Sequence, residues 1–154
     1  TENTVWAAVL AEGKTVSENA AREPEMVDIV DMLTKMGANI SGSGTSEIII
    51  EGVERLKPTN HEVIGDRVAA GTFLAAIFST RGSGKVKGIN PEHLPMEIKK
   101  LKEMGAIIDL KENSISIEYD EGINSSELAT LPFPGVATDI HRLFGSAYLQ
   151  AAGT

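Results

Sequence analysis

Apolar and polar positions along this chain repeat in the same order in two segments, residues 23–40 and 91–108. A shift of 68 residues superimposes Leu33 on Leu101, and each segment then continues into the same Met-Gly-Ala run. Within each segment the apolar residues recur at intervals of three and four, which is the spacing of an amphipathic helix. We therefore predict one helix in each segment and an internal structural repeat.

Glycine and proline mark the ends of these two helices. Gly37 and Gly105 stand in the Met-Gly-Ala runs, where a helix commonly ends on a residue with a left-handed backbone. We predict a positive φ at both glycines, because glycine adopts it without steric cost. Pro24 and Pro91 stand where the first turn of a helix tolerates proline, so each helix is predicted to begin there.

Short strands are predicted on both sides of each helix. The strand at Ser114–Tyr119 alternates apolar and polar residues, as a strand with one buried face does. The strand at Glu47–Glu51 has consecutive isoleucines, so we expect it to bury apolar side chains on both faces. The remaining predicted strands are Lys14–Glu18, Ala38–Ser41, Lys85–Ile89 and Ala106–Leu110.

A nearly apolar helix is predicted ahead of each repeat, at Trp6–Ala11 and Val68–Phe78, and we expect both to be buried on all sides. A third apolar stretch, Asp139–Ala152, begins another unit. The glycines that close the three stretches, spaced by 69 and 71 residues, are Gly13, Gly82 and Gly153. Each unit reads as a βαβαββ-like module, and because the third is cut short we expect a segment of a longer polypeptide.

Glycine-rich turns and histidines indicate no phosphate or metal site. Arg81–Val86 is similar to a phosphate-binding loop, but it lacks the glycine spacing and the following helix, so a helix-to-strand turn is predicted. Gly42-Ser43-Gly44 is interpreted as a hairpin turn. The histidines are far apart in sequence, and we expect surface or capping roles for them: His61, His93 and His141.

Composition and charge exclude several classes of function. The 154 residues are 42% hydrophobic and 23% charged, which is typical of a globular protein. Because there is no cysteine, these residues form no disulfide, thiolate metal site or thiol nucleophile. The net charge of −8 argues against nucleic acid or a membrane surface as a partner. No apolar run is long enough to span a bilayer, and the first residues lack the basic segment of a signal peptide.

Two aspartates at predicted helix starts have two alternative roles. Asp66 precedes the helix at Val68–Phe78, and Asp139 begins the last apolar stretch. Each could be an N-cap, whose side chain accepts hydrogen bonds from the first helical amides. Alternatively, each could be a functional carboxylate at the open end of an inverse barrel, where helix starts favour anions. Leu131–Gly135 is predicted to be a rigid, proline-containing loop that fixes the position of Asp139.

Longer runs of residues resemble one enzyme family over essentially the whole chain. The most specific runs are Glu18–Glu25 (ENAAREPE) and Ile50–Leu56 (IEGVERL). They resemble the UDP-N-acetylglucosamine enolpyruvyl transferases, whereas the related shikimate-pathway enolpyruvyl transferase matches them less well. Further matching runs are Leu10–Gly13, the two Met-Gly-Ala helix ends, Asp66-Arg67 with Gly71–Phe73, and Pro132-x-Pro134-Gly135 followed by Thr138-Asp139.

The resemblance implies a fold of mixed α/β (α+β) class. Members of the family have two lobes, each an inverse α/β barrel, or prism, of three βαβαββ units, with the active site between the lobes. This chain would hold a partial set of these repeats. Residues 1–60 would be the last part of one lobe and residues 61–154 the start of the second, with the crossing near residues 57–66.

The resemblance also implies a reaction. The family transfers the enolpyruvyl group of phosphoenolpyruvate to the 3′-hydroxyl of UDP-N-acetylglucosamine, the first committed step of peptidoglycan precursor synthesis. It does so in the cytoplasm, without a metal or an organic cofactor. Asp139 matches the family's aspartate that acts as the base or binds the sugar, so it is the expected catalytic and substrate-binding residue. Asp66 and Arg67 match a pair to which we assign a hinge or lobe-closure role.

Part of the implied machinery lies outside these residues. The family's acid is usually a cysteine on a mobile loop, which would precede residue 1, so the remainder of the enzyme is an expected partner and the isolated chain is expected to be inactive. The sequence also departs from the family: Phe133 stands where His or Tyr is frequent, and residues 140–144 lack a glutamine-rich start. Two alternatives stay open: another enolpyruvyl transferase, such as the shikimate-pathway enzyme or a specialised-metabolism relative, and a non-catalytic repeat module that binds a partner through its sheet edges.

Overall fold

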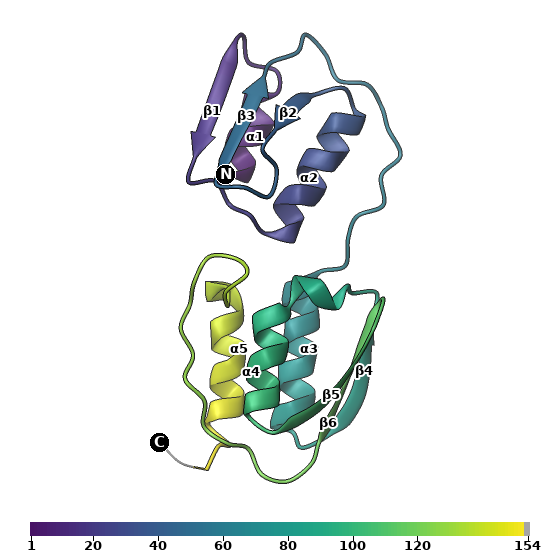
Figure 1. The fold of residues 1–154 in the computed structure, drawn as a ribbon. Coiled ribbons are helices and arrows are strands. Elements are labelled where there is room, and N and C mark those ends of the chain that lie inside the picture. Colours follow the sequence, from purple (N-terminus) through teal and green to yellow (C-terminus); the bar gives the residue numbers. More distant parts are fainter. Residues whose placement is uncertain (153–154) are drawn as a thin grey trace. The chain divides into compact units, whose positions relative to one another are not determined.

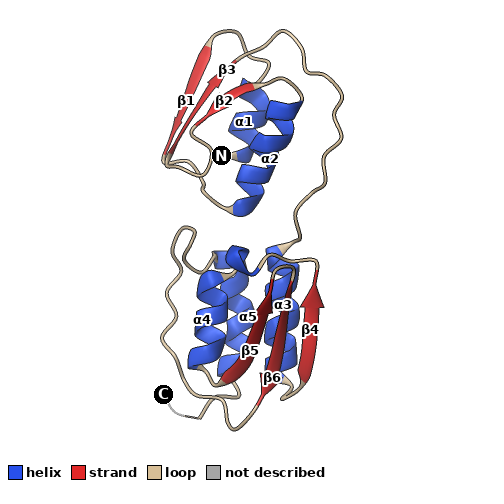
Figure 2. Cartoon of the chain, turned by 45° about the vertical axis from the view of Figure 1, so that its right-hand side comes forward, coloured by secondary structure: helices blue, strands red, loops and turns tan. Residues whose placement is uncertain are grey.

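The computed structural model describes residues 1–152 and divides the chain into two compact units, Thr1–Ile64 and Gly65–Thr154. Each unit combines a three-stranded antiparallel sheet with helices (Figures 1 and 2). Gly153, the predicted close of the third apolar stretch, lies outside the described residues. Among residues 1–152, no helix has both the length and the apolar character needed to cross a bilayer.

The first unit packs two helices against one face of its sheet. The strand order is β1-β3-β2, with β3 in the centre. Ile48 and Ile50 of β3 are fully buried and join a core with Val5, Met26 and Leu33 from the helices. The elements of this unit are α1 (Glu2–Ala8), β1 (Lys14–Glu18), α2 (Pro24–Lys35), β2 (Asn39–Ser41) and β3 (Glu47–Glu51).

The second unit repeats this topology and adds a further helix. Its strand order is β4-β6-β5, so the last strand of the repeat is again the central one, and the predicted internal repeat is confirmed. Leu74 and Phe78 of α3 meet Ile115 and Ile117 of β6 in its core. The elements are α3 (Arg67–Ser79), β4 (Ser83–Lys87), the 3₁₀ turn η1 (Pro91–His93), α4 (Pro95–Glu103), β5 (Ala106–Lys111), β6 (Ser114–Tyr119) and α5 (Thr138–Tyr148).

Both predicted glycine caps are confirmed. Gly37 has a φ of 98° and Gly105 a φ of 106°. After α2, the Gly37 amide donates to Thr34 O at 2.9 Å and the Ala38 amide donates to Leu33 O at 2.9 Å. This pair of bonds satisfies carbonyls that the end of the helix would otherwise leave free, and it turns the chain directly into β2.

Two predicted elements of the second repeat have the wrong boundaries. Pro91 begins η1, and α4 begins four residues later at Pro95. A residue before proline is disfavoured in the helical region, and Leu94 accordingly leaves it, with φ −132° and ψ 41°. Strand β4 begins and ends two residues before the predicted Lys85–Ile89, because Gly88 turns the backbone to a φ of 79°.

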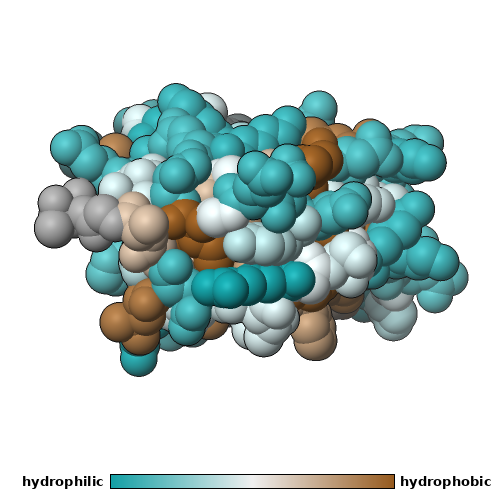
Figure 3. Space-filling view, turned by 90° about the horizontal axis from the view of Figure 1, so that it is seen from below, coloured by the Kyte–Doolittle hydropathy of each residue, from teal (hydrophilic) through white to brown (hydrophobic). Residues whose placement is uncertain are grey.

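The expectation of complete burial is wrong for three segments. Helix α1 spans Glu2–Ala8 rather than Trp6–Ala11, and Trp6 keeps 44% of its surface exposed. In α3, Phe73 is 61% exposed, and in β3 only Ile48 and Ile50 are buried while Ile49 is half-buried. Exposed apolar side chains also lie on strands, with Val16 47% and Ile107 53% exposed. Figure 3 shows brown, hydrophobic patches on the face that it draws.

The predicted glycine turns are confirmed as connections between elements. In the run Arg81–Val86, Arg81 and Gly82 link α3 to β4, and the strand begins at Ser83; Arg81 lies in the left-handed region at a φ of 57°. Gly42-Ser43-Gly44 joins β2 to β3, which pair antiparallel. Neither turn precedes a helix, so neither can present a helix start to a phosphate group.

Candidate active site at the helix starts of the second unit

Helices α3 and α5 run parallel, so their first turns lie at the same end of the second unit (Figure 1). Near their ends, Ser79 Oγ and Ser146 Oγ are 3.3 Å apart. Near their starts, Gly71 faces Ile140 so closely that a Cβ on the glycine would lie 3.7 Å from Ile140 Cγ2. Because the start of each helix carries a partial positive charge, this end of the unit favours negative groups.

Asp66 is the N-cap of α3. Its Oδ1 accepts hydrogen bonds from the amides of Val68 at 2.8 Å and Ala69 at 3.0 Å. These bonds satisfy amide groups that have no partner within the helix. The N-cap interpretation is therefore confirmed for Asp66, whose carboxylate is engaged by its own helix.

Asp139 has a different position, and the N-cap interpretation is wrong for it. The N-cap of α5 is Ala137, so Asp139 is the second residue of the helix, and its side chain makes no capping bond. Within residues 1–152 its exposed carboxylate takes part in no hydrogen bond or ion pair. The structure thus presents a free carboxylate in the first turn of α5, where the helix start stabilises its charge.

A closed loop leads into α5 and contacts the start of α3. The Leu131 amide donates to Val136 O at 3.1 Å, and the Gly135 amide donates to Pro132 O at 2.9 Å. Between them, the ring of Phe133 lies under the guanidinium of Arg67, with 5.9 Å from Cζ to the ring centre. The structure thereby brings Arg67 together with the loop that precedes Asp139, which the sequence could not show.

Glu97 is a charged residue at this end of the unit that the sequence analysis missed. It is the third residue of α4, only 1% exposed, and its Oε1 has no hydrogen-bond partner among the described residues. Burial raises the pKa of Glu97 above its ordinary value of 4.5, while a hydrogen bond to its own backbone and the charge of Arg67 lower it by less. The internal repeat offered a way to find it. The same shift of 68 residues places Glu97 opposite Ile29, so a charged residue stands where the first repeat has an apolar one.

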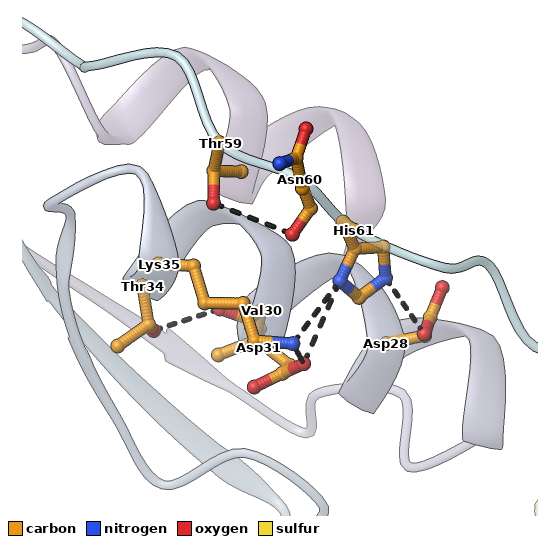
Figure 4. A network of polar contacts seen from close by, with 8 residues as sticks. All are labelled: Asp28, Val30, Asp31, Thr34, Lys35, Thr59, Asn60 and His61. Carbon is orange, nitrogen blue, oxygen red and sulfur yellow. Dashed lines mark hydrogen bonds and ion pairs between the residues drawn. The ribbon is translucent and has the colours of Figure 1, made fainter.

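His61 belongs to a polar network in the first unit, and the expected surface or capping role is wrong for it (Figure 4). Its side chain is 6% exposed, and its Nε2 lies 3.0 Å from Asp28 Oδ1. On the other side of the ring, Nδ1 lies 3.4 Å from Lys35 Nζ and 3.6 Å from Asp31 Oδ2. Three side chains of α2 thus bind the segment that follows β3.

The other two histidines do not extend this network into a metal site. His93 ends η1 half-buried, and its Nδ1 is enclosed without a hydrogen-bond partner among residues 1–152, so the expected surface or capping role is also wrong for it. His141 is exposed in α5, as expected. In the part of the chain that the structure describes, no three His, Asp or Glu side chains are grouped to hold a metal ion.

Comparison with known proteins places the chain in one enzyme family. The model of the family "EPSP synthase (3-phosphoshikimate 1-carboxyvinyltransferase)" matches residues 1–154. The chain belongs to this family. The resemblance found in the sequence is therefore confirmed at the level of the enolpyruvyl (carboxyvinyl) transferases.

Curated members of the family resemble the chain along its whole length. A UDP-N-acetylglucosamine 1-carboxyvinyltransferase of Nocardia farcinica is 49% identical over 154 residues, which are all of this chain and 36% of that protein. An enzyme of the same name from Corynebacterium efficiens is 50% identical over 140 residues, 91% of this chain and 33% of that protein. The chain thus spans about a third of the length of the curated relatives that it matches.

Solved structures of the family confirm the fold. The enolpyruvyl transferase NikO from Streptomyces tendae superimposes with a TM-score of 0.79 at 19% identity, over 95% of this chain and 35% of NikO. EPSP synthase from Acinetobacter baumannii superimposes with a TM-score of 0.54 at 21% identity, over 94% of this chain and 32% of that protein. The predicted α/β class with a partial set of enolpyruvyl transferase repeats is thereby confirmed.

Proposed function

We propose that these residues form part of an enzyme that transfers the enolpyruvyl group of phosphoenolpyruvate to the 3′-hydroxyl of UDP-N-acetylglucosamine and releases phosphate. The observation that carries this proposal is the 49% identity, over the entire chain, to a relative named for that substrate. In this proposal the enzyme acts in the cytoplasm, in the first committed step of peptidoglycan precursor synthesis. Its partners are the two substrates and the remainder of the polypeptide.

Asp139 is the residue that we propose as the base. The reaction needs a group that accepts the hydroxyl proton as the sugar oxygen attacks phosphoenolpyruvate, and an acid that gives a proton to the methylene carbon. An exposed carboxylate without a partner is free to approach a hydroxyl group, and among residues 1–152 Asp139 meets that condition. Because the chain has no cysteine, the proposal assigns the acid to a residue outside it.

The surroundings of Asp139 suit anionic substrates. The parallel starts of α3 and α5 direct partial positive charge toward the same end of the second unit. Arg67 adds a full positive charge beside the loop that precedes α5. Preorganised positive groups of this kind stabilise negative charge that develops during a reaction. In the proposed enzyme, residues 1–60 and 61–154 belong to two lobes, and Asp66 with Arg67 stands near the crossing.

A second candidate function rests on the name of the family model. EPSP synthase acts on 3-phosphoshikimate, as its name states, and the model of this family matches the whole chain. Both functions need phosphoenolpyruvate and differ in the hydroxyl group that attacks it. A direct substrate comparison therefore separates the two.

The test is a chimera in which residues 1–154 replace the matched segment of the Nocardia farcinica relative. Phosphate release is measured with phosphoenolpyruvate and either UDP-N-acetylglucosamine or 3-phosphoshikimate. We expect turnover with the sugar nucleotide only, and none from the 154 residues alone. Turnover with 3-phosphoshikimate would favour the second candidate. A folded chimera that is inactive with both acceptors would contradict both.

A further inference from the structure

Three helices of the second unit begin beside one side chain, that of Arg67. Arg67 is the first residue of α3 and is only 6% exposed. Its guanidinium faces the ring of Phe133 in the loop before α5, and its charge acts on Glu97 in the first turn of α4. A planar cation over an aromatic ring inside a protein is attracted to it more strongly than in water. Arg67 therefore joins the start of α3 to the loop before α5, and its charge reaches the first turn of α4.

The buried carboxyl group of Glu97 lowers the free energy of unfolding when it ionises. Its carboxyl group is buried, and the effect of burial exceeds the attraction of Arg67, so ionisation of Glu97 is disfavoured overall. The equivalent position of the first repeat is the apolar Ile29. A buried ionisable side chain whose pKa is shifted is more frequent at functional sites than elsewhere in a protein.

We propose that Arg67 is a positioning residue for the enolpyruvyl transfer: with its guanidinium over the ring of Phe133, it fixes the loop before α5 and thereby the place of Asp139. The inference rests on the proposed function for its catalytic part. Among the residues that the structure describes, no hydrogen bond or ion pair holds the carboxylate of Asp139, so the first turn of α5 sets its position. That turn is held by the closed loop and by the packing of Ile140 on Gly71.

The closed loop and the first turn of α5 are each held by a backbone hydrogen bond. The loop is closed by the amide of Leu131, and the first helical bond of α5 runs from the Ile140 amide to Ala137 O at 3.1 Å. If Arg67 releases Phe133, both amides should open to solvent more often. Catalysis is sensitive to such motion, because a small misplacement of a catalytic group can cost a large factor in rate.

The first arm of the test measures amide hydrogen exchange in the 154-residue chain. Arg67→Lys removes the planar guanidinium and Phe133→Leu removes the ring, and each should speed exchange at Leu131 and Ile140 by about tenfold. Phe133→Tyr keeps the ring and should exchange as the wild type does. The matched control is Arg81→Lys at the other end of α3, because the Arg81 guanidinium also lies 5.9 Å from a ring centre, that of Tyr119.

The second arm measures kcat and KM for phosphoenolpyruvate in the chimera. Arg67→Lys and Phe133→Leu should each lower kcat by about tenfold with a smaller change in KM, because Asp139 is misplaced in the transition state. Phe133→Tyr and Arg81→Lys should both keep the kcat of the wild type. A general loss of stability would not produce this split between kcat and KM in the folded enzyme.

The outcomes separate this inference from the proposed function. Unchanged exchange at Leu131 and Ile140 in Arg67→Lys would overturn the positioning role, even if kcat falls. Faster exchange with an unchanged kcat would overturn the catalytic part. A wild-type chimera without turnover would contradict the proposed function, while the exchange measurements would still decide whether Arg67 holds the loop.

Discussion

The Nε2–H group of His61 donates a hydrogen bond to Asp28 Oδ1 over 3.0 Å, and so fastens the segment after β3 to helix α2. The two side chains are only 6% and 12% exposed. A hydrogen bond to a carboxylate that is shielded from water is stronger than one between neutral groups. Four residues earlier, the Lys57 amide donates to Met36 O at 2.8 Å, so two bonds hold this segment on the first unit.

Replacing His61 should loosen this segment. His61→Ala leaves the carboxylate of Asp28 buried without its donor, and we expect a loss of about 1.5–3 kcal/mol in the free energy of unfolding. Urea unfolding checks the magnitude, and hydrogen exchange at Lys57 checks the place. The control is Asp31→Asn, because Asp31 is half exposed and should contribute no more than about 1 kcal/mol. Equal losses in both variants would contradict a specific role for the buried pair.

The two aspartates at helix starts should respond differently to replacement by alanine. Asp66→Ala removes two capping bonds, so we expect a loss of about 1 kcal/mol in the free energy of unfolding. Asp139→Ala removes no capping bond and should cost less than about 1 kcal/mol through the lost helix-start charge alone. Urea denaturation of both variants measures the contrast. A larger loss for Asp139 than for Asp66 would show that the caps are misassigned.

A β-branched residue at the end of α4 should strain the backbone. Gly105 has a φ of 106°, so Gly105→Val should lower the free energy of unfolding by about 1–3 kcal/mol. The matched control is Gly145→Ala, since Gly145 lies within α5 and a Cβ there meets no atom within 4 Å. That control should raise stability by about 0.5–1 kcal/mol, because alanine favours the helix. Thermal or urea unfolding that ranks the two variants in the reverse order would be inconsistent with the cap.

Asp139→Asn should separate catalysis from folding. If Asp139 accepts the hydroxyl proton, the amide cannot replace it, and kcat of the chimera should fall at least about tenfold, at the low edge of the range for general base catalysis. The circular dichroism spectrum and the urea midpoint should stay close to those of the parent, because no capping bond is lost. Near-normal kcat at saturating concentrations of both substrates would eliminate the role of base.

Stability should depend on pH through Glu97. Its pKa in the folded chain is raised by burial, so the folded chain holds this proton at pH values where the unfolded chain has lost it. The stabilising contribution of Glu97 to the free energy of unfolding is therefore fully present below about pH 4.5, and it is lost as the pH rises through the pKa of the folded chain. We expect Glu97→Gln to match the wild type near pH 4 and to exceed it near pH 8. Urea unfolding at both pH values should show a difference that grows with pH, and a constant difference would refute this.

Local features of the chain could be predicted because they depend on neighbouring residues. The glycine caps at Gly37 and Gly105 follow from the backbone freedom of glycine after an amphipathic helix. Strand β1 begins and ends where predicted, and the repeat at a shift of 68 residues anticipated the common topology of the two units. Asp139 was singled out by resemblance, and its role as a base stays a prediction.

Contacts between distant segments could not be predicted in the same way. The order of the helices and strands follows from the chain alone, because periodicity, glycine and proline act over a few residues. The folded structure was needed to show that Asp66 caps its helix while Asp139 does not, that His61 is buried against Asp28, and that Arg67 lies over Phe133. The physical reason is that burial and charge pairing depend on which segments pack together, and each of these contacts beyond the caps joins residues about thirty or more positions apart, a separation over which sequence periodicity carries no signal.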